Sequence, residues 1–247
     1  MKKVFLICFV AVISCLTSVA FVYAGWPINR TLPIEGTVTD ATTGEPIENV
    51  IISAEWAKWA IRANDIFSKK LIVTGKDGRY RIPSRLSFHI ISRFSYVEIS
   101  VRHPLYESKV GWGNSYVWHA KGMEHLRKGG KEWYYERPEI KHPSEKRGVH
   151  GYYKDGKIHF DIKLVSLEEK YRDNVGVWGK KKSLSTEFRY NGPAYFSLAK
   201  RKKITIDYIE ILRNWENITN RFPNDKHLKN AFKKGKEQII EIMEKER

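Results

Sequence analysis

The sequence predicts a mainly β protein, an antiparallel β-sandwich that carries an aromatic-rich insertion and a C-terminal α-helical hairpin. Between residues 34 and 101, short runs of alternating apolar and polar residues are separated by turn signals, with no long helical pattern between them. From Ile204 onward the apolar residues recur every three or four positions, which is the period of a helix face. Hydrophobic residues make up 42% of the chain, enough for a sizeable core.

The expected strands are short, rich in β-branched residues and bounded by turn chemistry. Residues 40–46 combine Asp, Thr, Gly and Pro, which bond locally, accept a positive φ or end a turn. Residues 75–78 form a tight reversal of the Asp-Gly type. The strands are expected at residues 34–39, 50–54, 71–74, 80–83 and 94–101.

Three of these segments carry a resemblance to a known family. Residues 34–40 (Ile-Glu-Gly-Thr-Val-Thr-Asp), 44–47 (Gly-Glu-Pro-Ile) and 74–80 (Thr-Gly-Lys-Asp-Gly-Arg-Tyr) resemble the carboxypeptidase regulatory-like domain. His103-Pro104-Leu105-Tyr106 looks like a later turn of that family, with Leu105 in place of Gly, and residues 158–164 resemble its closing strand. The resemblance implies a transthyretin-like (prealbumin-like) β-sandwich with an accessory or binding role, and it carries over no catalytic residues.

A long insertion, from Glu107 to Lys157, opens the last hairpin of this pattern. The insertion combines aromatic side chains with lysines and arginines. The aromatic rings could stack on sugars or bases, and the positive charges could hold phosphate or carboxylate. The alternative is that the rings cover an open face of the sandwich, because so long a connection must be anchored. The candidate binding surface comprises Trp112, Tyr116, Trp118, Lys128, Lys131, Trp133, Tyr134 and Tyr135.

The N-terminal segment reads as an export signal. Basic Lys2 and Lys3 precede an apolar run over residues 4–22, and Ala24 offers a small residue for cleavage before Gly25. Two alternatives stay open: an uncleaved membrane anchor formed by residues 4–22, or a lipobox that attaches lipid at Cys15. Each alternative places the folded part outside the cytoplasm, in the periplasm or at the cell envelope.

Four units follow from this organisation. Residues 1–24 are the signal peptide or anchor, and residues 33–165 form the sandwich with its insertion at 107–157. Residues 166–202, with their glycines and lysine run, read as an irregular connection. Residues 203–247 form the helical hairpin.

The two helices of the hairpin follow from their apolar stripes and from the break between them. Phe222-Pro223-Asn224-Asp225 interrupts the pattern, with Asn224 or Asp225 placed to cap the second helix. The first stripe contains Ile204, Tyr208, Ile211, Trp215, Ile218 and Phe222, and the second contains Leu228, Phe232, Ile239 and Met243.

The formal charge of +16 favours anionic partners. A positively charged protein could bind an envelope glycan, an anionic lipid or another envelope protein. Nucleic acid is a less favoured partner, because most of it is inside the cell and this chain is expected to be exported. The only cysteines, Cys8 and Cys15, lie in the apolar leader, so the mature chain is expected to hold no disulfide and no cysteine metal site.

A search for catalytic motifs finds one weak candidate. His142 and Glu145 have the His-x-x-Glu spacing of a zinc hydrolase, but no pattern places a third ligand. No nucleophile elbow, Walker loop or dinucleotide fingerprint is present. We therefore expect no catalytic residue, metal or cofactor.

The sequence as a whole predicts an exported, non-enzymatic β-sandwich protein that acts as a binding or scaffolding module at the cell envelope. The alternatives are a zinc-dependent hydrolase that uses His142 and Glu145, and a basic module that binds nucleic acid.

Overall fold

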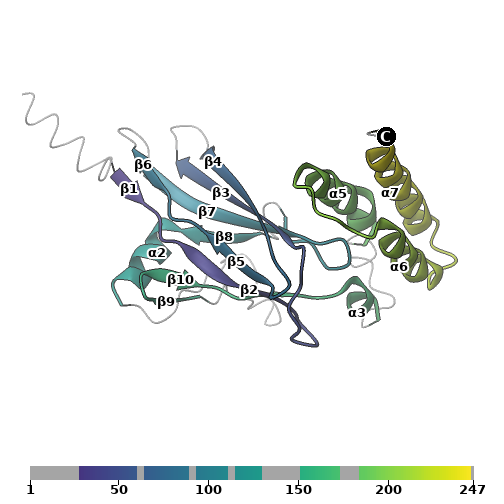
Figure 1. Ribbon diagram of the computed structural model, residues 1–247, viewed down its shortest axis with the longest axis horizontal. Coiled ribbons are helices and arrows are strands. Elements are labelled where there is room, and N and C mark those ends of the chain that lie inside the picture. The colour runs from purple at the N-terminus through teal and green to yellow at the C-terminus, as the bar shows by residue number, and fades with distance from the viewer. Residues whose placement is uncertain are drawn as a thin grey trace, which may run out of the picture.

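The computed structural model describes residues 28–59, 64–88, 93–110, 115–129, 151–172 and 184–245. It combines β-sheets with several helices, and the two kinds of element are segregated (Figure 1). The strands gather at one side of the molecule, while α5, α6 and α7 lie together at the other side. The sequence prediction of β-sheets followed by C-terminal helices is therefore confirmed at this level.

One sheet has four strands in the order β4-β3-β7-β8, and every pairing in it is antiparallel. Along β3, Ile52, Ala54 and Trp56 are buried on one face, as strand alternation requires. The strands of this sheet are β3 (Ile51–Trp59), β4 (Asn64–Val73), β7 (Arg93–Arg102) and β8 (Tyr116–His119).

The second sheet is built around β2 (Ile34–Asp40) and is mixed. β5 (Arg79–Ile82) pairs with β2 in the antiparallel sense, but β10 (Lys157–His159) and β11 (Ile162–Leu164) pair with it in the parallel sense. The prediction of a wholly antiparallel arrangement is therefore wrong. Parallel neighbours cannot be joined by a tight turn, and here the chain forms β3 to β9 (Tyr152–Lys154) before it returns to pair with β2. A separate ribbon pairs β1 (Ile28–Arg30) with β6 (Leu86–Phe88).

The closing strand is divided because it passes close to Gly36. The Phe160 N–H donates to the Glu35 carbonyl at 2.8 Å, and the Thr37 N–H donates to Asp161 Oδ1 at 2.8 Å. A Cβ atom on Gly36 would lie 1.9 Å from the Phe160 carbonyl oxygen. Only glycine allows the two backbones to approach so closely.

Both predicted turns are present. Asp40 Oδ1 accepts hydrogen bonds from the N–H groups of Thr42 (2.8 Å) and Thr43 (3.0 Å), and Gly44 follows with a φ of 77°. Gly78 has a φ of 66°. These turns fix the register of the strands that they connect.

The sheets share one hydrophobic core. It contains Trp56, Val97 and Ile99 from the first sheet and Ile34, Val38 and Ile158 from the second. Trp118 packs edge-on against Phe160 with the ring centroids 5.5 Å apart. Met123 and Leu126 of α2 (Ala120–Arg127) close one end of this core. Each fully buried side chain of this size contributes about 1.5–3 kcal/mol of transfer free energy.

The segment predicted as irregular, residues 166–202, is largely helical where the structure describes it. α3 (Leu167–Arg172) comes first, and a π-helical turn, η2 (Glu187–Asn191), leads directly into α5 (Gly192–Arg201). The glycine and proline read as loop signals, but Pro193 lies at the start of α5, where its missing N–H costs no hydrogen bond.

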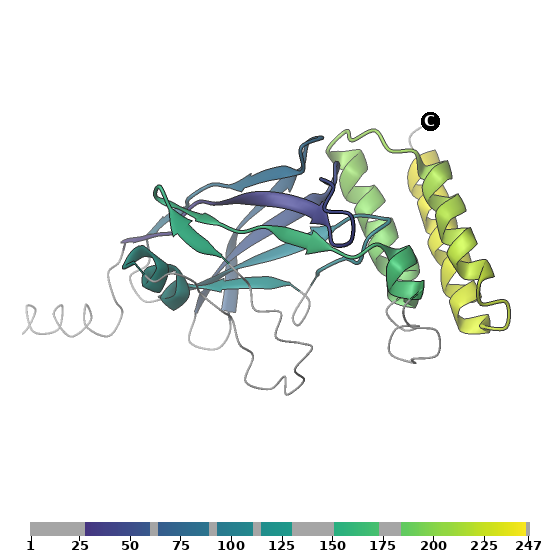
Figure 2. The same ribbon diagram turned by 90° about the horizontal axis from the view of Figure 1, so that it is seen from below.

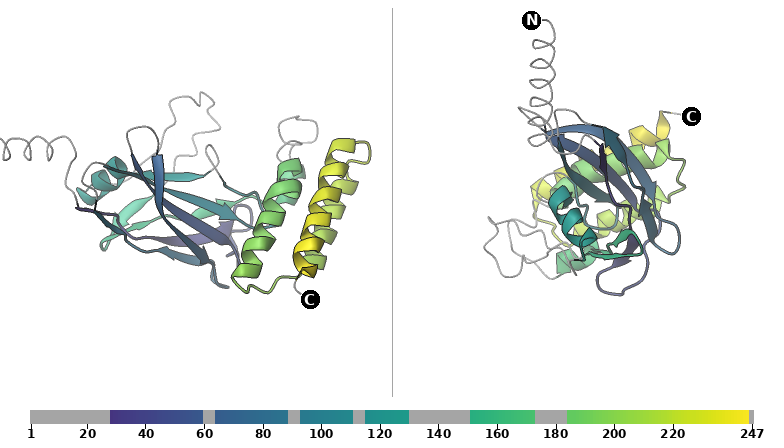
Figure 3. Two further views of the ribbon diagram at one scale, coloured as in Figure 1. Left: turned by 90° about the horizontal axis from the view of Figure 1, so that it is seen from above. Right: turned by 90° about the vertical axis from the view of Figure 1, so that its left-hand side faces the viewer.

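The predicted hairpin consists of α6 (Tyr208–Asn220) and α7 (Lys226–Glu244), which run side by side in opposite directions (Figures 2 and 3). Asp207 caps α6, and Asp225 caps α7 by accepting a hydrogen bond from the Leu228 N–H at 3.1 Å. The first helix begins later than its apolar pattern suggests, since residues 204–207 are not helical.

A second core lies between these helices, centred on Trp215 and Phe188, whose ring centroids are 4.9 Å apart. Two glycines make it possible. A Cβ atom on Gly192 would lie 2.0 Å from the Trp215 ring, and one on Gly235 would lie 1.8 Å from the Phe188 carbonyl oxygen. The backbone of α5 at Gly192 therefore contacts the Trp215 side chain, and the backbone of α7 at Gly235 contacts the backbone of η2.

A polar junction connects the helices to the end of β7 and the residues that follow it. The buried Glu187 carboxylate accepts from the Ser108 N–H at 3.0 Å, and Arg102 donates to Asn191 Oδ1 at 3.1 Å. Burial raises the pKa of Glu187. Burial also opposes ionisation of Glu107, but Lys109 and Lys170 more than offset it, so the pKa of Glu107 is lowered.

Candidate functional site

The described members of the predicted aromatic and basic surface do not form a surface. Trp118 is fully buried in the sheet core, so its ring cannot stack on a ligand. Tyr116 is half-buried and packs on Phe160 at a centroid distance of 5.1 Å. Lys128 is exposed and lies 3.4 Å from Glu124 at the end of α2. The remaining members lie outside the described residues: Trp112, Lys131, Trp133, Tyr134 and Tyr135.

The zinc alternative also falls outside the part of the chain that the structure describes, because His142 and Glu145 are both in residues 130–150. Within the described ranges, no three His, Cys, Asp or Glu side chains gather so that they could hold a metal ion.

The most distinctive surface of the described chain is a row of cations on α7. Lys226, Lys229, Lys233 and Lys236 recur at intervals of three and four residues, so they share one side of the helix. We call this row the lysine face. The opposite side of α7 is buried through Leu228, Ala231, Gly235 and Ile239. At the α-helical rise, the lysine face extends about 15 Å along the axis.

Most side chains of the lysine face are exposed to solvent. Lys226, Lys229 and Lys233 are exposed, and Lys236 is half-buried, with its Nζ 6.0 Å from the centroid of the Phe232 ring. None of the four forms an ion pair with another residue in the described ranges.

The charge order along α7 opposes the helix dipole. The first turn contains no acidic residue and the last turn no basic residue, while Glu237, Glu241 and Glu244 follow the lysines. A helix is stabilised by the reverse order, with each misplaced charge worth about 0.3–1 kcal/mol. Like charges three or four residues apart add a further penalty of about 0.2–0.5 kcal/mol per pair. The lysine face therefore lowers the intrinsic stability of α7, so its presence calls for an explanation other than folding.

The position of α7 leaves the lysine face accessible. α6 and α7 occupy the end of the molecule farthest from β1 and α2 (Figures 1 and 3). The linear sequence does not show this surface, because two or three other residues separate each of its lysines from the next. The signal that reveals it is the combination of helical spacing with the reversed charge order.

Comparison with known proteins gives no family assignment. No family model and no curated protein matches the chain. Several solved structures match over a little more than half of it. They include catechol 1,2-dioxygenase from Acinetobacter radioresistens (20% identity, 55% of this chain and 52% of that chain, TM-score 0.30), 3-chlorocatechol 1,2-dioxygenase from Rhodococcus opacus (12%, 56% and 60%, 0.30) and hydroxyquinol 1,2-dioxygenase from Pseudomonas putida (13%, 55% and 57%, 0.31).

These findings correct two expectations. The resemblance to the carboxypeptidase regulatory-like domain is not upheld, because the matching structures are dioxygenases and no model of any family matches. The expectation of a non-enzymatic module is likewise wrong against these comparisons, since the matching proteins are enzymes. The chain spans just over half the length of these dioxygenases, and at a TM-score of about 0.30 the likeness assigns no reaction to it.

The predicted export signal lies in residues 1–24, outside the described part of the chain. Among the helices that the structure describes, none has both the length and the hydropathy needed to cross a bilayer.

Proposed function

We propose that this protein docks on an anionic phospholipid surface through the lysine face of α7. The observation that carries the proposal is the row of four lysines placed against the helix dipole on an exposed helix at one end of the molecule. The proposal concerns where the chain attaches, and it is independent of any reaction that the chain catalyses.

The composition of the lysine face favours lipid phosphate over the other anionic partners. Recognition of bases relies on Arg, Asn or Gln in bidentate pairs, and sugars or unpaired bases are held by exposed aromatic rings. The four cations are all lysines, which act as point charges suited to diffuse attraction. The one aromatic ring beside them, Phe232, is half-buried and packs in the helical core.

The expected attachment is weak and sensitive to salt. A lysine near an anionic bilayer contributes about 1 kcal/mol, so four contribute roughly 4 kcal/mol, which corresponds to a dissociation constant near the millimolar range. Stable attachment requires a second contribution. We propose that the apolar run at residues 4–22, retained as an anchor or lipidated at Cys15, supplies it.

We further propose that the two sheets form a sandwich on which the helices are mounted. The shared core of the two sheets supports this arrangement, and the polar junction beside Glu187 holds the helices at one end of it. Rigid attachment of the helices to the sheets would keep the lysine face in a fixed orientation relative to the sheets.

The proposal is tested by co-sedimentation of the full chain with vesicles of phosphatidylcholine, with and without one third phosphatidylglycerol, at low and high salt. We expect a component of binding that weakens as salt is raised, and we expect this component only with the vesicles that contain phosphatidylglycerol. Replacement of Lys226, Lys229, Lys233 and Lys236 by Gln should weaken that binding roughly a hundredfold or more at low salt. Binding to the neutral vesicles measures any contribution of the leader.

The matched control removes the same charge from elsewhere on the surface. Lys76, Lys154, Lys163 and Lys202 are exposed and lie outside α7, so their replacement by Gln should leave most of the binding intact. An equal loss in both variants would show that net charge alone drives adsorption and would overturn the lysine face as a site. Binding of duplex DNA at the same salt, stronger than vesicle binding, would also contradict the proposal.

A further inference from the structure

The outward side of the second sheet brings an exposed aromatic ring and several cations together. Ile34 is buried in the sheet core, so the next residue of β2, Glu35, points outward. The register of the strands places Arg81 of β5 and His159 of β10 on either side of Glu35. Tyr152 of β9 lies opposite His159 and completes a row about 14 Å wide. In Figure 2, β2 and β10 lie in front of the first sheet, and no helix of the described chain covers them.

The ring of Tyr152 is held in place and is accessible. It stacks on the His159 ring with the centroids 4.9 Å apart and the planes 11° from parallel. The His159 Nδ1 lies 3.8 Å from Glu35 Oε1, so the supporting ring is itself positioned. Of the Tyr152 residue, 49% is exposed. Tyr152 therefore offers a flat apolar surface that a ligand can reach.

The hairpin of β9 and β10 carries two lysines that folding does not favour. Asp155 and Gly156 have φ values of 50° and 79°, as the two-residue turn of such a hairpin requires. Lys154 and Lys157 flank this turn and lie directly opposite each other. Like charges in this arrangement destabilise a sheet. Of the two, Lys157 forms an ion pair, with Glu35 at 3.1 Å.

The remaining cations of this surface are free to meet a ligand. Arg81 and Lys154 are exposed, and neither forms an ion pair within the described residues. Asp161, the next outward carboxylate, accepts a hydrogen bond from the Thr37 N–H at 2.8 Å and is thereby tied to β2. The row and the lysine pair thus combine three cations with the one carboxylate of Glu35. We call this surface the Tyr152 face, comprising Glu35, Arg81, Tyr152, Lys154, Lys157 and His159.

We infer that the Tyr152 face binds an acidic polysaccharide, a chain of sugars that bears carboxylates. The apolar side of a sugar ring can stack on the exposed ring of Tyr152. The three cations lie on three different strands, β5, β9 and β10, so they are spread out to meet charges along an extended chain. A single small anion would instead need donors that converge on one point.

Other anionic partners fit the Tyr152 face less well. Single-stranded nucleic acid is held by a series of rings on which successive bases stack. Tyr152 is the one exposed aromatic ring among the described residues of this face. The lysine face differs because the ring beside it, Phe232, is half-buried, so it offers charge without a stacking surface.

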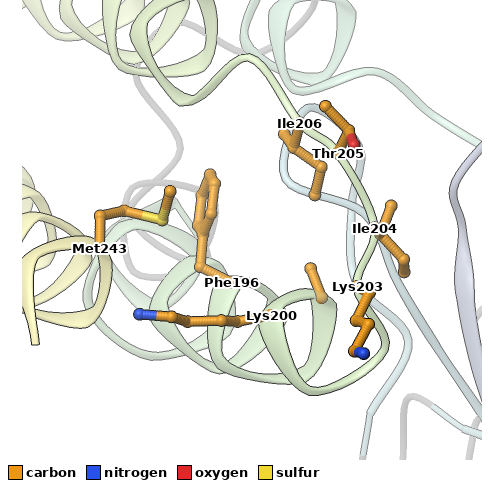
Figure 4. A pocket seen from close by; sticks show the side chains of 8 residues that line it. Phe196, Lys200, Lys203, Ile204, Thr205, Ile206 and Met243 are labelled. Atoms are coloured by element: carbon orange, nitrogen blue, oxygen red, sulfur yellow. The ribbon is translucent and has the colours of Figure 1, made fainter. Parts of the chain in front are cut away.

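The pocket between α5, the connection to α6 and the last turns of α7 does not suit the same ligand. Most of the side chains that line it are apolar, among them Phe196, Ile204 and Met243. The ammonium groups of Lys200 and Lys203 point away from it (Figure 4). An acidic ligand therefore meets its charges on the Tyr152 face and not in this pocket.

The test is calorimetric titration of the full chain with an oligomer of galacturonic acid, without vesicles, at low and high salt. We expect saturable binding that weakens as salt is raised, and weaker binding of the methyl-esterified oligomer, which lacks the charges. Tyr152→Ala should weaken binding about tenfold because it removes the stacking surface, whereas Tyr152→Phe should bind like the wild type. Joint replacement of Arg81 and Lys154 by Gln should weaken binding about fivefold to tenfold.

A stability measurement accompanies the binding data. Lys154→Gln removes the like charge opposite Lys157, so it should raise Tm by about 1–2 °C while it weakens binding. A loss of affinity in this variant therefore cannot come from unfolding. An unchanged affinity in both the Tyr152→Ala variant and the double variant would overturn the inference.

The matched controls lie in the helical region. Joint replacement of Arg201 and Lys202 by Gln removes one arginine and one lysine that are exposed, and Tyr190→Ala removes a ring that is 57% exposed. Both should bind the oligomer like the wild type. Equal losses in these controls, or tighter binding of single-stranded oligothymidylate at the same salt, would contradict the inference. The variant with four Gln on the lysine face should retain the oligomer, so failure here and failure of docking on lipid are distinguishable.

Discussion

Each of the two cores is built around a fully buried tryptophan, and the two side chains differ in what the indole N–H group does. Trp118 packs against Phe160 in the sheet core, where its Nε1 has no hydrogen-bond partner. Trp215 packs against Phe188 in the helical core, and its Nε1 donates to the Pro104 carbonyl at 3.0 Å. One ring fills space, whereas the other also connects two parts of the fold.

The difference shows how the helical region depends on the sheets. Pro104 follows β7, so Trp215 ties α6 to the sheet region by a buried hydrogen bond. Tyr195 of α5 does the same by donating to the Asn49 carbonyl at 2.7 Å. The two regions also share apolar contacts, because Ile51 of β3 is buried in the helical core and Leu71 and Val73 of β4 pack against that core. We therefore expect the two regions to unfold as one cooperative unit, with the helices unable to stand alone.

The largest effect is expected from Gly235→Ala in α7. In an open helix this change stabilises by about 1 kcal/mol, but here the new Cβ would lie 1.8 Å from the Phe188 carbonyl oxygen. The two backbones must separate, so we expect a loss of about 3 kcal/mol in the free energy of unfolding. Urea denaturation followed by tryptophan fluorescence and by circular dichroism measures it.

The companion variant in the sheet region is Gly36→Ala, whose Cβ would lie 1.9 Å from the Phe160 carbonyl oxygen. A cooperative molecule loses a similar amount in both variants through a single transition. Gly75→Ala is the control, because its nearest contact is an ordinary 3.5 Å to Asp77 Oδ1 and its effect should stay within about 0.5 kcal/mol. Two separate transitions in Gly235→Ala would show that the regions are independent.

A second effect is expected at His103, which lies where the two regions meet. Its Nδ1 accepts from the Leu105 N–H at 3.2 Å, and its ring contacts Tyr106 and Tyr195. Burial lowers the pKa of His103 to about 4. The unfolded chain therefore binds more protons between pH 6.5 and 4, so the stability is full above this window and is lost as the pH falls through it. We expect a loss of about 2 kcal/mol, allowing for its partial exposure.

The pH dependence is isolated by comparison with His103→Asn. Asparagine can accept a hydrogen bond from the N–H group two residues on and does not titrate in this range. Carboxylates contribute equally to both proteins, so the difference between their stability–pH curves reports His103. Parallel curves between pH 4 and 7 would contradict the assignment.

The sequence predicts the sheet region better than the helical region, for a physical reason. Strand alternation and the turns at Asp40 and Gly78 are local signals, and each is present in the structure. The parallel return of β10 and β11 depends on pairing with β2 more than a hundred residues earlier, which no local pattern encodes. Gly192 reads as a loop signal, yet it begins α5 because the Trp215 ring occupies the space of a Cβ atom.

The candidate sites were less predictable than the fold. In the linear sequence, aromatic residues beside lysines indicate a binding surface. In the structure, Trp118 lies on the buried side of β8 and its ring is inaccessible. The lysine face requires a helix before its members line up.

The smallest effect tests the comparison of the two tryptophans directly. Trp118→Phe and Trp215→Phe each remove a similar volume from a fully buried position, so their cavity costs should be alike. Trp215→Phe also leaves the Pro104 carbonyl without its donor, whereas Trp118→Phe removes an N–H that has no partner. Trp215→Phe should therefore cost about 1–2 kcal/mol more, as measured by urea denaturation. Equal losses would mean that the bond to Pro104 contributes nothing beyond packing, and the dependence of the helices on the sheets would then rest on apolar contact alone.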